Sequence, residues 1–333
     1  MSEPTRELCE HMFFDMKVLL KQPQTVYRID NYASGRYYFT MNTENEPTFY
    51  ISVTNMIGST LPTSPHLIKW IADMGYEESQ DFKNERANYG TFLHMKIGEL
   101  LINRQLNFDL MKIQLLGYCE EQKIDPAKAD EWLFEMQKDC LAFVQFMNDY
   151  QVKPIAIEMV LAHPDGYAGA IDLLCDMTVE QKGFFGEVYK SGPRKGQPKE
   201  TKKEIKCRAF VDFKSGRKGF FEAHEIQLES YKRMGKHHFP HLFNEGQPPI
   251  KLFNWAPKEW KSSPSYSLKD QTYSTNLEKF DNLVSIGNIE AKKRKRTKLV
   301  ISGTINVDDV MSGKEFIEKN FQYKNIEDLI MEN

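Results

Sequence analysis

The pattern of apolar and polar positions changes twice along the chain. Residues 5–21 follow a helical pattern, and the segments 25–30, 36–41 and 47–53 are rich in aromatic and β-branched residues. Such residues favour strands, and the turn-prone stretches ASG and NTEN separate these segments from one another. The first part of the chain is therefore predicted to form a helix followed by a small β meander.

The middle of the chain is predicted to be helical. Residues 64–75 begin with a serine, continue with a proline and end with a glycine, which are boundary signals of a helix. A longer polar helix is expected from about Glu77 to Leu101, and two more from Asp109 to Gln122 and from Pro126 to Tyr150. This region therefore contributes helices and no strands to the predicted fold.

Strand and helix patterns alternate beyond Pro154. Their order predicts an α/β fold with a mixed central sheet sandwiched by helices. A stretch rich in Gly, Lys and Pro, from about residue 181 to 203, separates two of the strands. The expected strands are 155–161, 167–177, 205–214 and 249–256, and the expected helices are 222–238 and 276–296.

Composition narrows the class of protein. Hydrophobic residues make up 41% of the 333 residues, which is enough for a buried core. The formal net charge of −3 provides no global basic field, so nucleic acid has to be contacted by local basic segments. The five cysteines form no Cys-x-x-Cys pair, and no run of about 18 apolar residues occurs. A reduced, cytoplasmic protein without a membrane span is expected, and the N-terminus has the pattern of neither a signal nor a transit peptide.

The triplet Asp-Phe-Lys occurs twice in different settings. Asp81 and Lys83 lie within the expected polar helix, where residues two apart point to nearly opposite sides. Asp212 and Lys214 end an expected strand, where residues two apart share a face. The second copy therefore has the geometry that a metal ion and a polarising cation need near a phosphodiester. An ordinary ion pair at the edge of the sheet is the alternative.

Two further acids lie in apolar strands. Asp172 is found in AGAIDLL and Glu158 in IAIEMVL, and a buried carboxylate without a partner is costly. A metal ion is one such partner, and magnesium prefers several oxygen ligands. Acids on three successive strands can converge at one edge of a sheet. A capped or salt-bridged structural role is the alternative for Asp172, and for Glu158 both interpretations stay open.

Two of the predicted helices add polar side chains at fixed spacing. Gln227 and Tyr231 are four residues apart and share one helical face. His94 follows Gly90 by one turn on the long polar helix. A lone helical histidine can instead be a hydrogen-bonded core residue, and Tyr231 can act mainly in packing.

In this order, the motifs resemble a nuclease family. The order is G-T-x-x-H (90–94), Glu158, G-x-x-D (169–172), D-x-K (212–214) and Q-x-x-x-Y (227–231). It resembles the RecB-type branch of the PD-(D/E)XK nucleases. Residues 52–75 are also similar to the leader of phage exonucleases and of mitochondrial genome maintenance exonucleases. The resemblance spans roughly residues 50–255 and implies a restriction-endonuclease-like fold.

The resemblance implies a role for each matched residue. Lys214 would position or activate the attacking water and offset charge on the phosphate, while Gln227 and Tyr231 would hold the DNA backbone or orient the site. The implied ion is Mg²⁺ or Mn²⁺, without ATP. No cysteine follows Cys207, so the iron-sulfur cluster of some relatives is not expected. Metal ligation is implied for Asp172, Asp212, the Phe213 carbonyl, His94 and Glu158, of which Asp172, Asp212 and Glu158 also count as catalytic.

Basic segments are the expected DNA contacts. The insertion near residues 181–203 interleaves cations with aromatic residues, which suits a flexible hairpin that grips a nucleic-acid strand, and a solvated loop is the alternative. The run 292–298 can bind phosphates or be the cationic C-terminus of a helix. The expected contacts are Lys190, Arg194, Lys195, Arg217, Lys218, Lys232, Lys292, Lys293 and Arg294.

The expected function is therefore a metal-dependent DNA exonuclease, phage-encoded and acting on single-stranded ends in replication or recombination. A structure-specific or nicking endonuclease and a non-catalytic nucleic-acid-binding subunit of the same fold are the alternatives. The chain is expected to divide into an N-terminal helix and meander (1–60), a nuclease core (61–255) and a C-terminal helical extension (256–333). Within the core, residues 77–150 form the helical region.

Overall fold

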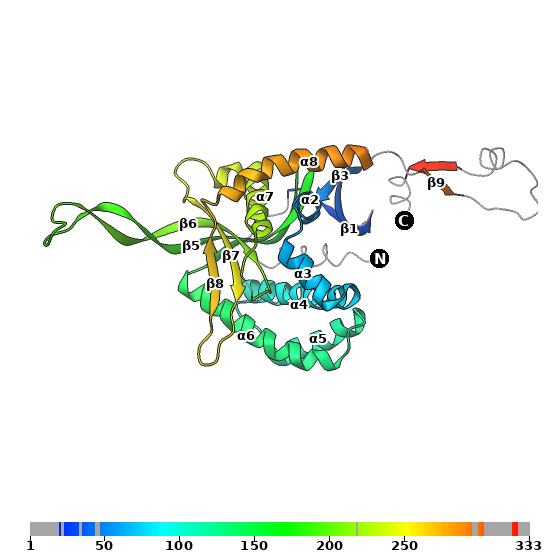
Figure 1. The fold of residues 1–333 in the computed structure, drawn as a ribbon, viewed down its shortest axis with the longest axis horizontal. Coiled ribbons are helices and arrows are strands. Elements are labelled where there is room, and N and C mark those ends of the chain that lie inside the picture. Colours follow the sequence, from blue (N-terminus) through cyan, green and yellow to red (C-terminus); the bar gives the residue numbers. More distant parts are fainter. Residues whose placement is uncertain are drawn as a thin grey trace, which may run out of the picture.

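The computed structural model describes residues 20, 23–32, 35–43, 47–217, 219–294, 299–302 and 322–325. Eight strands form one mixed sheet, in which β4 pairs with β5 beside the path β1-β2-β3-β5-β6-β7-β8 (Figure 1). The strands are β1 Tyr27–Tyr32, β2 Gly35–Met41, β3 Pro47–Ser52, β4 Lys153–His163, β5 Tyr167–Val188, β6 Pro198–Phe213, β7 Ile250–Pro257 and β8 Tyr266–Asp270.

The sheet contains five antiparallel and two parallel strand pairs. The meander β1-β2-β3 is antiparallel and joins β5 through a short parallel contact at Ile51 and Tyr167. The strands β4, β5 and β6 are antiparallel neighbours, β6 and β7 are parallel, and β7 and β8 are antiparallel. Because parallel neighbours need a crossover connection, a helix links β6 to β7. A separate two-stranded ribbon consists of β9 Leu299–Ser302 and β10 Gln322–Asn325.

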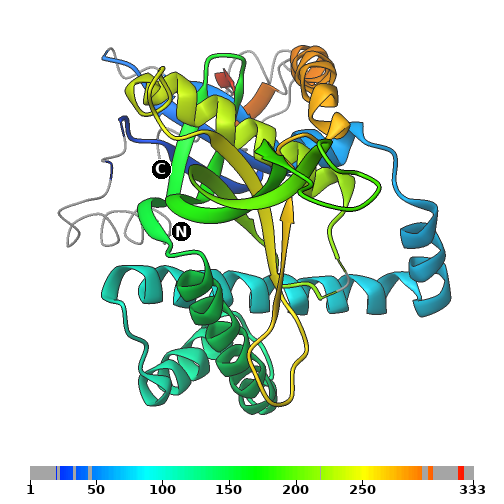
Figure 2. The same cartoon turned by 90° about the vertical axis from the view of Figure 1, so that its left-hand side faces the viewer.

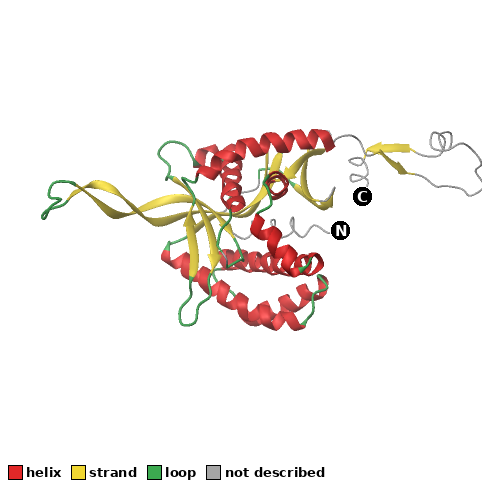
Figure 3. Ribbon diagram, viewed as in Figure 1, coloured by secondary structure: helices red, strands yellow, loops and turns green. Residues whose placement is uncertain are grey.

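Helices cover both faces of the central strands (Figures 1 and 3). One layer packs α4, α5 and α6 on the sheet, and the other packs α2, α7 and α8 on its opposite face. The short helix α3 leads into α4 (Figure 2). The helices are α2 Val53–Thr60, α3 Pro65–Met74, α4 Tyr76–Asn103, α5 Phe108–Glu121, α6 Ala127–Asp149, α7 Glu222–His238 and α8 Lys279–Arg294, with 3-10 turns at Pro240–Leu242 and Thr275–Glu278.

The alternation of side chains along β5 and β6 divides the core into two. Leu173 and Val211 pack in the cluster that contains α4 and α6, whereas their neighbours Leu174 and Phe210 pack in the cluster that contains α7 and α8. A strand covered on both faces reads as a continuous apolar run. The polar residues that interrupt this run in the centre of the sheet are therefore conspicuous.

Most of the expected elements are confirmed. The three early strands and the helices of the middle region form within a few residues of the expected bounds, whereas α2, β8, β9 and β10 were not expected. The last three strands lie in the region that was expected to be a helical extension. The helix expected over residues 5–21 falls outside the described residues except at position 20. The meander is part of the central sheet, and the boundary expected between residues 255 and 256 falls inside β7. The mixed central sheet flanked by helices is as predicted.

The basic insertion continues the two flanking strands. Antiparallel pairing runs without a break from Leu173 and Val211 to Phe184 and Glu200, and then resumes at Val188 and Pro198. The outer part projects from the body as a twisted two-stranded ribbon (Figure 1). We call residues 178–206 the arm, with a tip at residues 189–199 and a stem on either side. A loose loop, one of the two interpretations of the sequence, is therefore wrong for the stem.

Candidate functional site

Two buried acids lie side by side at the centre of the sheet. Asp172 on β5 is 6% exposed, and Asp212 on the neighbouring strand β6 is fully buried. The backbone N–H of Phe213 donates to Asp172 Oδ2 at 2.7 Å, so the end of β6 holds the carboxylate of β5. The ring of Phe213 packs edge-on against His94 and Phe143, which fixes this part of the backbone between the sheet and the helical layer.

Lys214 follows directly after β6 and faces Asp212, as the strand geometry predicts. Its Nζ donates to Asp212 Oδ1 at 2.8 Å and to Gln227 Oε1 at 3.1 Å. The side chain is about one-fifth exposed, so the ammonium group reaches from the buried acid towards solvent. The Asp-x-Lys pair thus forms part of a larger polar network instead of an isolated ion pair.

The expected pair on α7 completes this network. The Tyr231 hydroxyl lies 3.1 Å from Asp172 Oδ1 and 3.4 Å from Asp212 Oδ1, and Gln227 Nε2 donates to it at 2.7 Å. Burial and the nearby acids raise the pKa of Tyr231 well above its ordinary value. Tyr231 therefore stays a neutral donor that bridges the two carboxylates.

His94 and Glu158 lie on the other side of Asp172. His94 Nδ1 and Glu158 Oε1 share a hydrogen bond of 3.0 Å. On α4, Gly90 lies close to the chain after Lys214, because a Cβ atom at this position would be 3.0 Å from Ser215 Oγ. The glycine therefore allows α4 to approach the site closely enough for His94 to reach the acids.

Glu158 has an unusual backbone for a strand residue. Its φ angle is +47°, in the left-handed region that residues other than glycine rarely adopt. Such a conformation costs about 1–3 kcal/mol and persists where the surrounding structure enforces it, frequently at functional sites. The ladder pairs Ile157 with Leu173 and Met159 with Ile171, so the irregularity is confined to the residue opposite Asp172.

The electrostatics of the cluster reflect burial and mutual repulsion. Burial raises the pKa of Asp172, and the positive charges of His94 and Lys214 offset only part of the increase. Burial likewise raises the pKa of Asp212, against the opposing effect of Lys214. Burial alone would lower the pKa of His94, but Asp172 and Glu158 outweigh this effect and raise it to about 9. A cation placed among these groups would stabilise the charged carboxylates.

Among the described residues, one group has the spacing of a metal site. His94, Glu158 and Asp172 each offer a ligand atom, and these atoms lie within 4.8 Å of one another. Carboxylate oxygens and an imidazole nitrogen fit Mn²⁺, and the carboxylates fit Mg²⁺. Asp212 is not a member of this group, and its oxygens accept hydrogen bonds from Lys214, Tyr231 and Asn254. Asp212, on β6, therefore connects the candidate site to Asn254 on β7.

Two residues of this network were missed in the sequence. Asn254 on β7 is fully buried and donates from Nδ2 to Asp212 Oδ2 at 2.8 Å. Gln271 in turn donates from Nε2 to Asn254 Oδ1 at 3.2 Å, which fixes the orientation of the amide. Asn254 carries the same signal as Asp172, a polar residue in the apolar strand IKLFNWA. Gln271 follows β8, which was not predicted, and no pattern indicated it.

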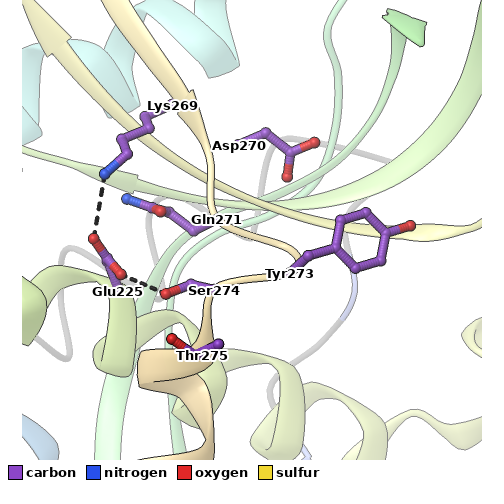
Figure 4. Close-up of a pocket in the computed structure, with 7 residues that line it drawn as sticks. All are labelled: Glu225, Lys269, Asp270, Gln271, Tyr273, Ser274 and Thr275. Carbon is purple, nitrogen blue, oxygen red and sulfur yellow. Dashed lines mark hydrogen bonds and ion pairs between the residues drawn. The ribbon is translucent and has the colours of Figure 1, made fainter. Parts of the chain in front are cut away.

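A pocket lies next to Gln271, outside the candidate site (Figure 4). It lies between the start of α7 and the chain after β8, and Gln271 is among its lining residues. The Glu225 carboxylate accepts hydrogen bonds from Ser274 at 2.5 Å, from Asn276 at 2.9 Å and from Lys269 at 3.3 Å. Burial raises the pKa of Glu225, but these hydrogen bonds lower it below its ordinary value. Glu225 thus fastens the loop that carries Gln271.

The expected DNA contacts differ in their surroundings. Lys190, Arg194 and Lys195 are exposed at the arm tip, whereas Lys232 is paired with Glu229 at 2.5 Å. Lys218 and residues 295–298 lie outside the described residues. Lys292, Lys293 and Arg294 form the last turn of α8, of which only the backbone is described. Among the expected DNA contacts, those at the arm tip are therefore the ones whose side chains are described and exposed.

Arg217 has internal partners. Its Nη2 donates to Asp139 Oδ1 at 2.7 Å, and its Nη1 pairs with Glu259. Asp139 on α6 is fully buried and also accepts from the Tyr89 hydroxyl on α4 at 2.7 Å. Both Nη atoms of Arg217 are thus paired within the protein, and its expected DNA contact stays a prediction. We assign Arg217 the role of fastening the chain after Lys214 to the helical layer.

No family model matches the chain, and a search of curated proteins finds no match. Within the described part of the chain, no helix has both the length and the apolar character needed to cross a membrane.

Proposed function

We propose that this protein is a metal-dependent deoxyribonuclease of the PD-(D/E)XK type, with a restriction-endonuclease-like fold, that acts as an exonuclease. One observation carries the proposal. Asp172 on β5 and the Asp212–Lys214 pair 40 residues later in the sequence meet in one hydrogen-bonded network through Tyr231. The group formed by His94, Glu158 and Asp172 adjoins this network. The mixed sheet with a helical crossover between β6 and β7 is compatible with such a fold.

The donor set fits the Mg²⁺ or Mn²⁺ ion that the proposal requires. His94, Glu158 and Asp172 would hold it, since their ligand atoms already lie within 4.8 Å of one another. A divalent ion bound there would supply Lewis-acid stabilisation of charge on the phosphate. Burial raises the pKa values of Asp172 and Asp212 although His94 and Lys214 act against the increase, so a bound divalent cation would further stabilise both carboxylates in the charged form.

The protein residues around this position have separate tasks. Lys214 stands with its ammonium group between Asp212 and solvent, where it can orient a water molecule or donate to a phosphate oxygen as negative charge develops. Tyr231 and Gln227 keep the two carboxylates and Lys214 in register through hydrogen bonds. Preorganised donors of this kind need little rearrangement during reaction.

The proposed substrate is DNA, on the basis of the family resemblance and of the exposed basic arm. A non-catalytic binding subunit of the same fold is disfavoured, because phosphate binding at a surface does not require two buried carboxylates, whose burial is costly. A circular single-stranded substrate distinguishes an exonuclease from an endonuclease, since only an endonuclease can open it.

The test is degradation of end-labelled single-stranded and duplex oligonucleotides with Mg²⁺, Mn²⁺ or EDTA. Wild-type protein is compared with Asp212→Ala and Lys214→Ala. We expect metal-dependent cleavage by the wild type and its loss in both variants, with the label reporting the polarity. Undiminished cleavage in the variants, or binding without cleavage by the wild type, would contradict the proposal.

A further inference from the structure

The charges of the arm are sorted between its stem and its tip. The stem is balanced, with four lysines (Lys182, Lys202, Lys203 and Lys206) and four glutamates (Glu180, Glu187, Glu200 and Glu204). The tip has no acid, and its cations are Lys190, Arg194, Lys195 and Lys199. Positive charge is therefore concentrated at the far end of the ribbon, although the sequence shows it spread over the whole insertion.

Two of the stem lysines have partners within the stem. Lys202 pairs with Glu180 at 2.6 Å, and Lys203 lies over the ring of Phe185 at 5.8 Å. That ring covers Gly183, where a Cβ atom would be 3.2 Å away. Within the tip, all of whose residues are described, none of the four cations forms an ion pair, all four are exposed, and no acid lies nearby in the tip to neutralise them. Clustered like charges without partners repel one another and favour a polyanion.

The tip has a defined shape that presents these cations. The N–H of Tyr189 donates to the carbonyl of Gln197 at 3.0 Å, and the N–H of Gly196 donates back to Tyr189 at 2.9 Å. Gly192 and Gly196 have φ angles of +79° and +83°, which favour glycine in such turns. The guanidinium of Arg194 lies over the ring of Tyr189 at 5.8 Å. Main-chain hydrogen bonds thus hold the turn, and the cationic side chains are left for contacts with a ligand.

The tip is remote from the candidate site. Along β5, Asp172 and Val188 are separated by at most about 50 Å at about 3.3 Å per residue, and the arm points away from the body (Figure 1). A B-form duplex rises about 3.4 Å per base pair along each strand, so up to about 15 base pairs cover this distance. A ligand that touches both places must therefore be long.

We propose that the arm tip is a second contact for the phosphate backbone of the DNA substrate, up to about 15 base pairs from the site of hydrolysis, while the stem acts as a spacer. This inference rests on the proposed function for the identity of the ligand. It makes tip-dependent binding a property of long DNA. Phosphate contacts contribute to affinity in proportion to the counterions they release, so the tip contributes a salt-dependent part of the affinity.

The experiment compares two matched variants. In the tip variant, Lys190, Arg194, Lys195 and Lys199 are replaced by Gln, and in the stem variant, Lys182, Lys202, Lys203 and Lys206 are replaced by Gln. Each loses four cations from the same ribbon. Binding to fluorescent 10- and 30-base-pair duplexes and to a 30-nucleotide single strand is measured by anisotropy in EDTA at several salt concentrations, so that cleavage does not interfere. Thermal unfolding midpoints verify that both variants fold.

On 30-base-pair DNA, we expect the tip variant to bind at least about tenfold more weakly, with a log-log salt slope smaller by about 3–4, since each lost phosphate contact accounts for about 0.9. The stem variant should change the slope by less than about 1. On the 10-base-pair duplex, the tip variant should bind as the wild type does. A tip effect on the duplex alone or on the single strand alone identifies which form is contacted.

An equal loss for the stem variant, an equal loss on short DNA, or no loss for the tip variant on any DNA would overturn the inference. Cleavage by the wild type and Asp212→Ala on the same DNA separates this outcome from failure of the proposed function. Metal-dependent cleavage without a tip effect refutes the remote contact alone. Tip-dependent binding without cleavage refutes the hydrolytic function and leaves the DNA contact in place.

Discussion

The inner and outer halves of the β5–β6 pair share one register as far as Phe184 and Glu200, but they have opposite character. Inside the molecule, the pair is covered on both faces, and its polar residues Asp172 and Asp212 are buried and hydrogen-bonded. In the arm, the same ladder is mostly exposed and carries charges on its surface. The strand pair thus keeps one geometry while burial changes the chemistry of its side chains.

This difference indicates where chemistry and long-range contact are placed. A buried carboxylate is costly without a partner, so the inner half needs a cation and a network of donors. Exposed lysines cost little, but each contact that they form in water is weak and sensitive to salt. The inner half therefore suits catalysis, and the tip of the outer half suits a diffuse attraction for a polyanion.

The largest expected effect is on catalysis by the inner half. Asp172→Asn removes one carboxylate of the proposed metal site, and we expect cleavage to fall by about 10²- to 10³-fold, the scale associated with loss of a group that stabilises transition-state charge. Steady-state cleavage rates with Mn²⁺ measure this effect. The matched control is Asp176→Asn on the same strand, where the carboxylate pairs with Arg208. Equal losses in both variants would mean that Asp172 has no special role.

A second prediction concerns stability. Leu173 is fully buried, and Leu173→Ala should lower the free energy of unfolding by about 3–5 kcal/mol, because transfer and cavity terms add. Phe184 in the stem is 69% exposed, and Phe184→Ala should change the free energy of unfolding by less than about 0.5 kcal/mol. Urea denaturation measures both. A large effect at Phe184 would show that the arm packs on the body in solution.

A third prediction addresses the amide beside Asp212. Asn254→Leu keeps a similar volume but removes the donor to Asp212 Oδ2, and we expect about a tenfold to hundredfold loss of cleavage, as for other residues that orient a metal site. Loss of this donor raises the pKa of Asp212 further, so the acidic limb of the pH–rate profile should move to higher pH. Gln271→Leu should have the same sign of effect and a smaller size. An unchanged pH profile would assign Asn254 a packing role only.

The smallest expected effect concerns Glu225, which holds the loop that carries Gln271. Glu225→Gln weakens the hydrogen bonds from Ser274, Asn276 and Lys269 and should cost about 1–2 kcal/mol of stability at neutral pH. The folded-state pKa of Glu225 lies below its ordinary value of 4.5. The stabilisation is therefore present above pH 4.5 and disappears as pH falls through the lower folded-state pKa. Urea unfolding of wild type and variant at several pH values measures the difference between their free energies of unfolding. This difference would not change with pH if Glu225 had no role.

The sequence predicted the inner half better than the arm. Periodicity placed Asp172 and Asp212 on strands, and their apolar neighbours marked them as unusual, because burial and cost are local properties of a strand. Helical spacing likewise placed Gln227 and Tyr231 on one face, and the structure brings Tyr231 to the acids and Gln227 to Lys214 and Tyr231. These positions were predictable because each follows from the geometry of a single element.

The parts that escaped prediction depend on several elements at once. The left-handed backbone of Glu158 and the chain from Gln271 through Asn254 to Asp212 arise from tertiary packing. Arg217 was expected to contact DNA, but a buried acid on α6 holds it, which no local pattern reveals. Sorting of charge in the arm also requires the register, since opposing residues are distant in the sequence.

Direct titration with Mn²⁺, followed by electron paramagnetic resonance, is the measurement closest to the central claim that the inner half of β5–β6 holds a divalent metal site. Wild type, Asp172→Asn and the control Asp176→Asn are compared without DNA. We predict that the wild type and Asp176→Asn bind Mn²⁺ alike and that Asp172→Asn binds at least about tenfold more weakly. Equal Mn²⁺ affinity of Asp172→Asn and wild type would contradict the account.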